Sequence, residues 1–140
     1  MRRIFSLALI ALTMMVVSCG KKDSDDVTPN KLVGTWYLES VKTNGQSETL
    51  TDCIKNTNIV FSDREYVFKF YNLKNTGYCD LVNTEEGTYT VSGNNFVVKP
   101  KGEGMESTKI SLSGDKLIFT DTETDNNGKK HTSELVFVKK

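Results

Sequence analysis

Eight short runs of apolar and β-branched residues follow one another from residue 35 to residue 139, and they constrain the fold more than any other feature of the chain. Most of these runs alternate apolar with polar side chains, and no window after residue 32 keeps a helical apolar spacing for more than one turn. The pattern predicts β-strands that each bury one face. The expected strands are Thr35–Thr43, Asn58–Phe61, Glu65–Tyr71, Gly87–Val91, Phe96–Pro100, Thr108–Leu112, Leu117–Asp121 and Thr132–Lys139.

The connections between these runs alternate in length. Residues 62–64, 92–95 and 113–115 are short turns by composition, whereas the connections near 44–57, 72–86, 101–107 and 122–131 are long. Alternate connections of an up-and-down meander lie at the same end, so we expect short turns at one end and long loops at the other. We therefore predict an all-β fold, an eight-stranded antiparallel up-and-down barrel. An open sandwich is the alternative, but it would leave edges with little protection from proline or inward charge.

The first twenty residues have the layout of a bacterial lipoprotein signal. Two arginines precede the apolar stretch Ile4–Val17, which is too short to span a bilayer comfortably and is typical of a secretory signal. Small Ser18 followed by Cys19 resembles a lipobox, in which the cysteine is acylated and the chain is cut before it. An ordinary signal peptide or an uncleaved anchor is the alternative. We expect a signal peptide at residues 1–18, a lipidated flexible tether at 19–30 and one domain at 31–140.

Cleavage before Cys19 would leave 16 basic and 18 acidic residues, because the removed segment contains two arginines and no acid. The resulting charge of −2, without a basic stripe, argues against a nucleic-acid partner. No second long apolar run follows, so acyl chains on Cys19 would hold the protein to the membrane. Gly20 resembles the residue that sends lipoproteins to the outer membrane. The charged residues 22–26 resemble a signal for export to the cell surface, or form a solvated spacer.

Two cysteines remain once Cys19 carries lipid. Cys53 and Cys79 lie in the first and third connections of the whole series, both of them long, so the meander places them at the same end. An even number of cysteines in an oxidising compartment predicts a disulfide, and two free buried thiols are the alternative. A bridge that closes about 27 residues would stabilise the fold by roughly 3.5 kcal/mol in the chain-entropy model.

Several short motifs support one resemblance. Gly34-Thr35-Trp36 is the Gly-x-Trp that opens the first strand of lipocalins, and Glu86-Gly87-Thr88-Tyr89 and Asp115-Lys116-Leu117 match further along the chain. With the cysteine spacing, they make residues 31–139 resemble the lipocalin-like domain of lipid-anchored proteins of Gram-negative bacteria. The resemblance implies that Trp36 plugs the short-turn end of the barrel. In lipocalins an arginine covers this tryptophan; here the last strand offers only Lys139 and Lys140.

The resemblance also implies a small apolar ligand inside the barrel, at the mouth formed by the long loops. The expected contacts are Leu38, Phe68, Phe70, Tyr89, Phe96, Ile110, Phe119 and Phe137, on inward faces that also carry Val98, Leu112, Leu117 and Leu135. In a domain this small, a core filled by the same side chains is the alternative. The other candidate function is an envelope interaction module (an inhibitor, adhesin or assembly accessory) that uses Tyr71, Tyr78 and Leu81 on its loops.

The sequence supplies no constellation for catalysis, a cofactor or a metal. His131 is the only histidine, so a histidine-rich metal site or a histidine-based triad cannot be built, and we expect a solvated surface role for it. The acidic residues 121–125 lack the pattern of a calcium-binding EF-hand loop and are expected to be solvated. We therefore expect a non-enzymatic protein without a cofactor or a metal.

Overall fold

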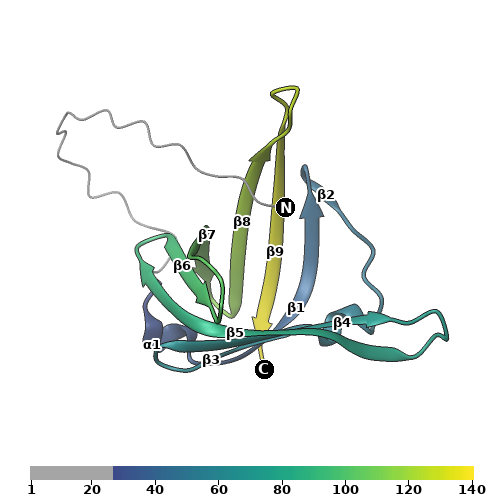
Figure 1. Ribbon diagram of the computed structural model, residues 1–140, viewed down its shortest axis with the longest axis horizontal. Helices are drawn as coiled ribbons and strands as arrows, with labels where there is room; N and C mark the ends of the chain where they lie inside the picture. The colour runs from purple at the N-terminus through teal and green to yellow at the C-terminus, as the bar shows by residue number, and fades with distance from the viewer. Residues whose placement is uncertain (1–26) are drawn as a thin grey trace.

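The computed structural model describes residues 27–140 (Figure 1). The predicted signal peptide and Cys19 lie outside the described residues. In chain order the elements are α1 (Pro29–Leu32), β1 (Gly34–Thr43), β2 (Gln46–Ser47), the 3-10 helix η1 (Ile54–Asn56), β3 (Asn58–Phe61), β4 (Glu65–Leu73), β5 (Cys79–Ser92), β6 (Asn95–Pro100), β7 (Glu106–Ser113), β8 (Lys116–Thr124) and β9 (Lys130–Lys139).

The strands form one antiparallel sheet that closes on itself. Neighbouring strands follow the order β1-β3-β4-β5-β6-β7-β8-β9, and β2 is a two-residue strand that pairs with the far half of β1. A ladder between β1 and β9, from Trp36↔Lys139 to Thr43↔Ser133, completes the circle. The predicted eight-stranded antiparallel barrel is therefore confirmed, and the open sandwich is excluded.

The two ends of the barrel differ as the loop lengths predicted. The β3–β4, β5–β6 and β7–β8 turns lie at one end, together with α1 and the start of β1, which we call the closed end. The remaining connections lie at the other end, which we call the mouth. The β4–β5 and β8–β9 hairpins reach beyond the rest of the barrel on this side (Figure 1).

Several strands are longer than the sequence pattern predicted. β5 begins at Cys79 rather than at Gly87, and β4 continues to Leu73, so most of the expected loop 72–86 is a hairpin with a tight turn. The outer half of β5 is rich in Asp, Asn and Glu, which have low strand propensity. Composition alone therefore suggested a loop. Backbone pairing with β4 overrides the low propensity and makes this segment a strand. β8 and β9 likewise extend into the expected loop 122–131.

A hairpin turn that the sequence analysis did not identify joins β1 to β2. Asn44 and Gly45 both have left-handed backbone conformations, with φ of 52° and 79°. This combination is what a two-residue hairpin turn requires, and the Asn-Gly pair is its strongest sequence signal. The turn shortens the expected loop 44–57, which also contains η1.

The core fills the barrel from the closed end upward. Its buried side chains come from α1, from the segment just before α1 and from every strand except β2. They are Val27, Leu32, Trp36, Leu38, Ile59, Phe61, Tyr66, Tyr89, Phe96, Ile110, Leu112, Leu117, Phe119 and Phe137. Val27 is only 3% exposed although it lies in the expected tether 19–30. The folded domain thus already includes Val27, because its apolar side chain and Leu32 cover the closed end.

Candidate functional site

The closed end is built around Trp36, whose side chain is 1% exposed. Its indole Nε1 donates a hydrogen bond to the Leu32 carbonyl oxygen at 2.7 Å, which ties β1 to α1. Lys139 Nζ lies 5.4 Å from the centre of the indole ring, within range of a cation–π contact. Gly34 has φ of 132°, and a Cβ there would lie 2.7 Å from Lys139 Cε. The glycine therefore leaves room for the lysine that covers the tryptophan.

Five aromatic rings, from β3, β5, β6, β8 and β9, meet in the core of the barrel. Phe61, Tyr89, Phe96, Phe119 and Phe137 form a continuous chain of ring contacts, with centroid distances of 5.0 to 5.9 Å. Most of these contacts are edge to face, which is a favoured packing geometry for aromatic rings. We call this chain the aromatic floor. It occupies the space in which the sequence analysis placed much of the ligand.

The eight residues predicted to contact a ligand therefore do not share one environment. Six of them are buried in the core: Leu38, Tyr89, Phe96, Ile110, Phe119 and Phe137. Phe68 is half-buried and packs against the core, whereas Phe70 is half-buried outside the core cluster. Ile59, Phe61 and Tyr66 belong to the core but were missing from the expected inward set. The alternation within β3 and the first half of β4 marks these three residues as inward-facing.

The polar tips of the buried tyrosines are satisfied at the barrel wall. Tyr89 Oη donates to the Ser62 carbonyl oxygen and Tyr66 Oη donates to Glu85 Oε1, both at 2.6 Å. Burial, and then the Glu85 carboxylate, raise the pKa of Tyr66 far above its usual range, so the phenol stays protonated. Residues 27–140 contain no buried side-chain nitrogen or oxygen without a hydrogen-bond partner. The buried polar side chains of the described interior are thus paired within the protein itself.

At the mouth, a layer of apolar side chains packs against the core and remains partly exposed. We call it the mouth layer; its members are Val41, Leu50, Ile54, Phe68, Val98 and Leu135. They come from β1, the β2–β3 connection, β4, β6 and β9, so they approach the barrel axis from several sides. Val41 and Leu135 are directly paired across β1 and β9.

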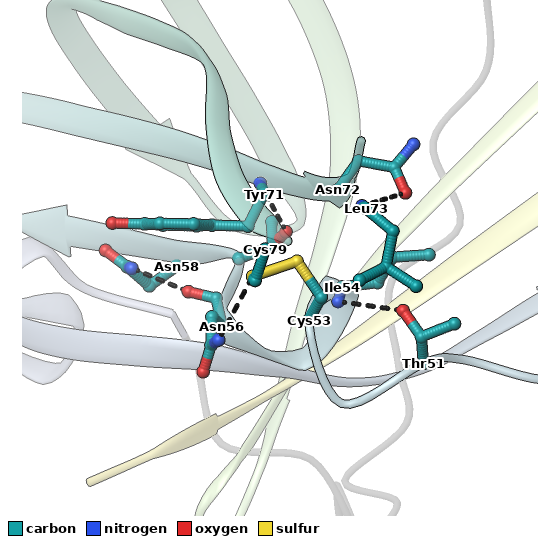
Figure 2. The surroundings of a disulfide bond; sticks show 10 residues. Thr51, Cys53, Ile54, Asn56, Asn58, Tyr71, Asn72, Leu73 and Cys79 are labelled. Atoms are coloured by element: carbon teal, nitrogen blue, oxygen red, sulfur yellow. Dashed lines mark hydrogen bonds between the residues drawn. A yellow bond between two sulfur atoms is a disulfide. The ribbon is translucent and has the colours of Figure 1, made fainter. Parts of the chain in front are cut away.

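A disulfide braces one wall of the mouth (Figure 2). Cys53, just before η1, is bonded to Cys79 at the start of β5, with a Cα–Cα distance of 5.3 Å. The predicted bridge is therefore confirmed. Next to it, the Tyr71 backbone N–H donates to Thr57 Oγ1 at 3.1 Å, and the Ile54 N–H donates to Thr51 Oγ1 at 3.2 Å. The disulfide and the Tyr71–Thr57 hydrogen bond hold η1, and with it Ile54 of the mouth layer, against the β4–β5 hairpin.

The β4–β5 hairpin also exposes large apolar side chains. Tyr78 is 76% exposed and Val82 is 58% exposed, and Leu73 and Leu81 are exposed beside them. Tyr78 and Leu81 were predicted to be exposed on a long loop, whereas Tyr71 is half-buried. Lys74 and Asp80 form an ion pair across the hairpin.

Two surface hollows lie beside β5, away from the aromatic floor. One, of about 310 Å³, runs over β4, β5 and β6 between Glu65 and Lys99. The other, of about 280 Å³, lies between residues 83–86 of β5 and the β6–β7 turn. Both hollows are lined in part by charged side chains.

His131 belongs to a small polar network at the tip of the β8–β9 hairpin. Its Nε2 lies 3.1 Å from Asp125 Oδ2, and its Nδ1 lies 3.3 Å from Asn44 Nδ2. Asn44 Oδ1 accepts the Thr132 N–H at 3.0 Å, so the Asn44 amide nitrogen donates to His131. The network ties two hairpin tips together, a structural role that the sequence did not reveal.

The described part of the chain contains no group of three or more His, Cys, Asp or Glu side chains placed to hold a metal ion. Between residues 27 and 140, no helix has both the length and the apolar character needed to cross a membrane.

Comparison with known proteins supplies a family. The model of a lipocalin-like domain matches residues 32–119. No curated protein sequence matches the chain. Among solved structures, bovine odorant-binding protein in complex with a selenium-containing odorant is 22% identical, with a TM-score of 0.46 over 86% of this chain and 78% of the other. Lobster apocrustacyanin A1 is 16% identical, with a TM-score of 0.47 over 85% of this chain and 72% of the other.

Proposed function

Because the chain belongs to the lipocalin-like domain family, we propose that it is a non-enzymatic binding protein that holds a small apolar ligand at the mouth of its barrel. The mouth layer is the observation that carries this proposal. Its side chains are only partly buried, and they rest on an aromatic floor without unsatisfied polar groups, so an apolar guest would complete their burial.

The filled interior limits the size and position of the guest. Covering apolar surface contributes about 25 cal/mol per Å², so a micromolar complex needs over roughly 300 Å² of newly covered area before association costs are counted. A shallow site above the floor reaches that area only with a ligand of several rings or a medium-length acyl chain. We therefore expect modest affinity for compact apolar molecules.

Titration of the unlipidated protein with an apolar fluorophore, such as N-phenyl-1-naphthylamine, tests the proposal. Leu135→Glu puts a charge into the mouth layer and is expected to weaken binding at least tenfold. Val60→Glu is the matched control, because Val60 lies on the outer face of β3. Circular dichroism checks that both variants are folded. Absence of saturable fluorescence, or equal weakening by both variants, would count against a ligand at the mouth.

We further propose that acyl chains on Cys19 anchor the protein in the outer membrane of a Gram-negative envelope. The support is the sequence from Arg2 to Gly20, with its short apolar stretch followed by Ser18-Cys19. Labelling of cells with radioactive palmitate should mark the native protein and not Cys19→Ala. Fractionation of the two membranes then tests the location, and label retained by the variant would refute the anchor.

The exposed side chains of the β4–β5 hairpin favour a second candidate function, recognition of another envelope protein. Tyr78, Leu81 and Val82 offer apolar surface that the barrel itself does not cover. Crosslinking in the membrane fraction followed by mass spectrometry distinguishes the two functions. A protein partner lost on Tyr78→Ser would support recognition, whereas a co-purified apolar molecule without a partner would support ligand binding.

A further inference from the structure

The outer half of β5 is a strand with one free edge. β5 spans Cys79–Ser92, but β6 pairs with it only from Gly87 onward. At the boundary, the Glu86 carbonyl accepts the Lys101 N–H at 2.9 Å. Within the described chain, residues 79–85 pair with β4 on one side and with no strand on the other. A free edge of this length is a ready template for another strand.

The direction of the backbone groups along this edge follows from two hydrogen bonds. The Tyr89 N–H donates to the Arg64 carbonyl on the β4 side, whereas the Glu86 carbonyl faces the β6 side. Successive residues of a strand alternate between the two sides, so Thr84 presents its N–H and C=O groups to the free edge. An extended chain beside β5 would therefore find main-chain donors and acceptors already in place.

The surroundings of the edge carry excess negative charge. The hollow of about 280 Å³ beside it is lined by Asn83, Thr84, Glu85, Glu86, Pro100, Lys101 and Glu103. Lys101 Nζ pairs with Glu86 Oε2 at 3.0 Å, which leaves Glu85 and Glu103 without a cation among the lining residues. Exposed Leu81 and Val82 continue the edge toward the hairpin tip. The surface thus combines free backbone groups, carboxylates and apolar side chains.

Charge decides which occupant the edge favours. In a second copy of this chain, an antiparallel β5–β5 pair would bring acidic residues such as Glu85 and Glu86 of the two copies close together, which disfavours pairing. A basic segment gains from the same carboxylates. We propose that the free edge of β5 at residues 79–85 docks an extended, lysine- or arginine-bearing segment of a partner protein, which adds as a strand to the barrel wall. The free edge would be the surface used in the second candidate function, recognition of another envelope protein. This proposal does not depend on ligand binding at the mouth.

Fluorescence anisotropy with a labelled ten-residue peptide of alternating Lys and Val tests the edge on the full unlipidated chain. Thr84→Pro removes the outward N–H without touching the β4 ladder, and Thr84→Ala keeps that N–H. We expect Thr84→Pro to weaken binding at least tenfold and Thr84→Ala to change it less than twofold. Equal binding by the two variants would overturn pairing at the edge.

The charge requirement is tested separately. The double variant Glu85→Gln and Glu103→Gln should weaken the peptide several-fold and flatten its salt dependence, and a peptide with Glu in place of Lys should not bind. The amide oxygen introduced by Glu85→Gln can still accept the hydrogen bond from the Tyr66 hydroxyl, so the barrel wall is preserved. Absence of saturable binding, or a concentration-dependent dimer that Thr84→Pro abolishes, would overturn the proposal. Fluorophore binding at the mouth, measured on the same samples, reports on ligand binding independently.

Discussion

Gly87 lies where β5 passes the end of β6, and it sets how closely the two strands approach. A Cβ at this position would lie 2.8 Å from Pro100 Cα and closer still to the Lys99 carbonyl oxygen. Both are backbone atoms, so they cannot move aside as a flexible side chain would. The contact that forms the boundary of the free β5 edge thus depends on the absence of a side chain.

Gly87→Ala is accordingly expected to destabilise the fold by about 1–3 kcal/mol or more, because the added methyl group forces the backbones of β5 and β6 apart. Urea unfolding monitored by tryptophan fluorescence measures the difference. Gly104→Ala is the matched control, because a Cβ there meets no atom within 4 Å. A loss of stability no larger for Gly87→Ala than for the control would contradict this account.

At the scale of elements, the turn between β8 and β9 is organised by one carboxylate. Asp125 Oδ1 accepts the N–H groups of Asn127 at 2.8 Å and Lys129 at 2.9 Å, and Oδ2 pairs with His131. The hydrogen bond from the Lys129 N–H, and then the one from His131, lower the pKa of Asp125 below its usual range. The ionised form is therefore the one that holds the turn.

The lowered pKa predicts how the turn responds to acid. A carboxyl group with a lower pKa in the folded state stabilises the fold above its unfolded pKa of about 3.9, and this contribution is lost as the pH falls through the folded pKa. The Tm of the wild type should exceed that of Asp125→Asn at pH 6, and the gap should close toward pH 2. Asn126→Ala is the control, because its difference in Tm from the wild type should not change with pH. A difference between the wild type and Asp125→Asn that also stays constant with pH would contradict the prediction.

The disulfide joins Cys53, just before η1, to Cys79 at the start of β5. The chain-entropy model gives roughly 3.5 kcal/mol for a closed loop of this size. Cys53→Ala with Cys79→Ala should lose up to that amount in urea unfolding, and hydrogen exchange should rise in the β2–β3 connection. Reduction of the disulfide in the wild type should cause the same loss of stability and the same rise in hydrogen exchange. Unchanged exchange around Ile54 would show that the bridge does not hold the mouth wall.

At the scale of the whole molecule, the described chain enters the barrel at the closed end. Val27 is buried there beside Leu32, and the mouth lies at the opposite end. An acylated Cys19 would leave only seven residues between the lipid and Val27, a reach of about 25 Å when fully extended. The proposed anchor would therefore hold the closed end toward the membrane and present the mouth and the free β5 edge away from it.

Energy transfer to acceptor lipids tests this orientation on the lipidated protein. Asn94→Cys puts a dye on the β5–β6 turn at the closed end, and Asn127→Cys puts the same dye at the tip of the β8–β9 hairpin. The introduced thiol is the free one, because Cys53 and Cys79 are bridged and Cys19 would carry lipid. The dye at position 94 should transfer more strongly. Equal transfer, or the reverse order, would contradict an upright barrel.

Much of the fold was predictable from the sequence because its signals are local. Alternating side chains mark strands such as β8, and the lengths of the connections between strands distinguish the two ends. The alternation of short and long connections also places Cys53 and Cys79 at the same end of the barrel. The outer half of β5 was missed, because its acidic residues form a strand only through pairing with β4. The Asn44-Gly45 pair is a sequence signal for a hairpin turn, although the prediction included it in the loop 44–57.

The sequence by itself determined the all-β class, the meander and the bridge, because each depends on spacing along the chain, and the resemblance to lipocalins indicated the plug at Trp36. Only the tertiary structure decided that aromatic rings fill the lower barrel, that Phe70 stays outside the core, and that β5 keeps a free edge. These depend on which side chains meet across the barrel and where two strands of unequal length stop pairing. Residues distant in sequence decide both, so no local pattern contains the answer.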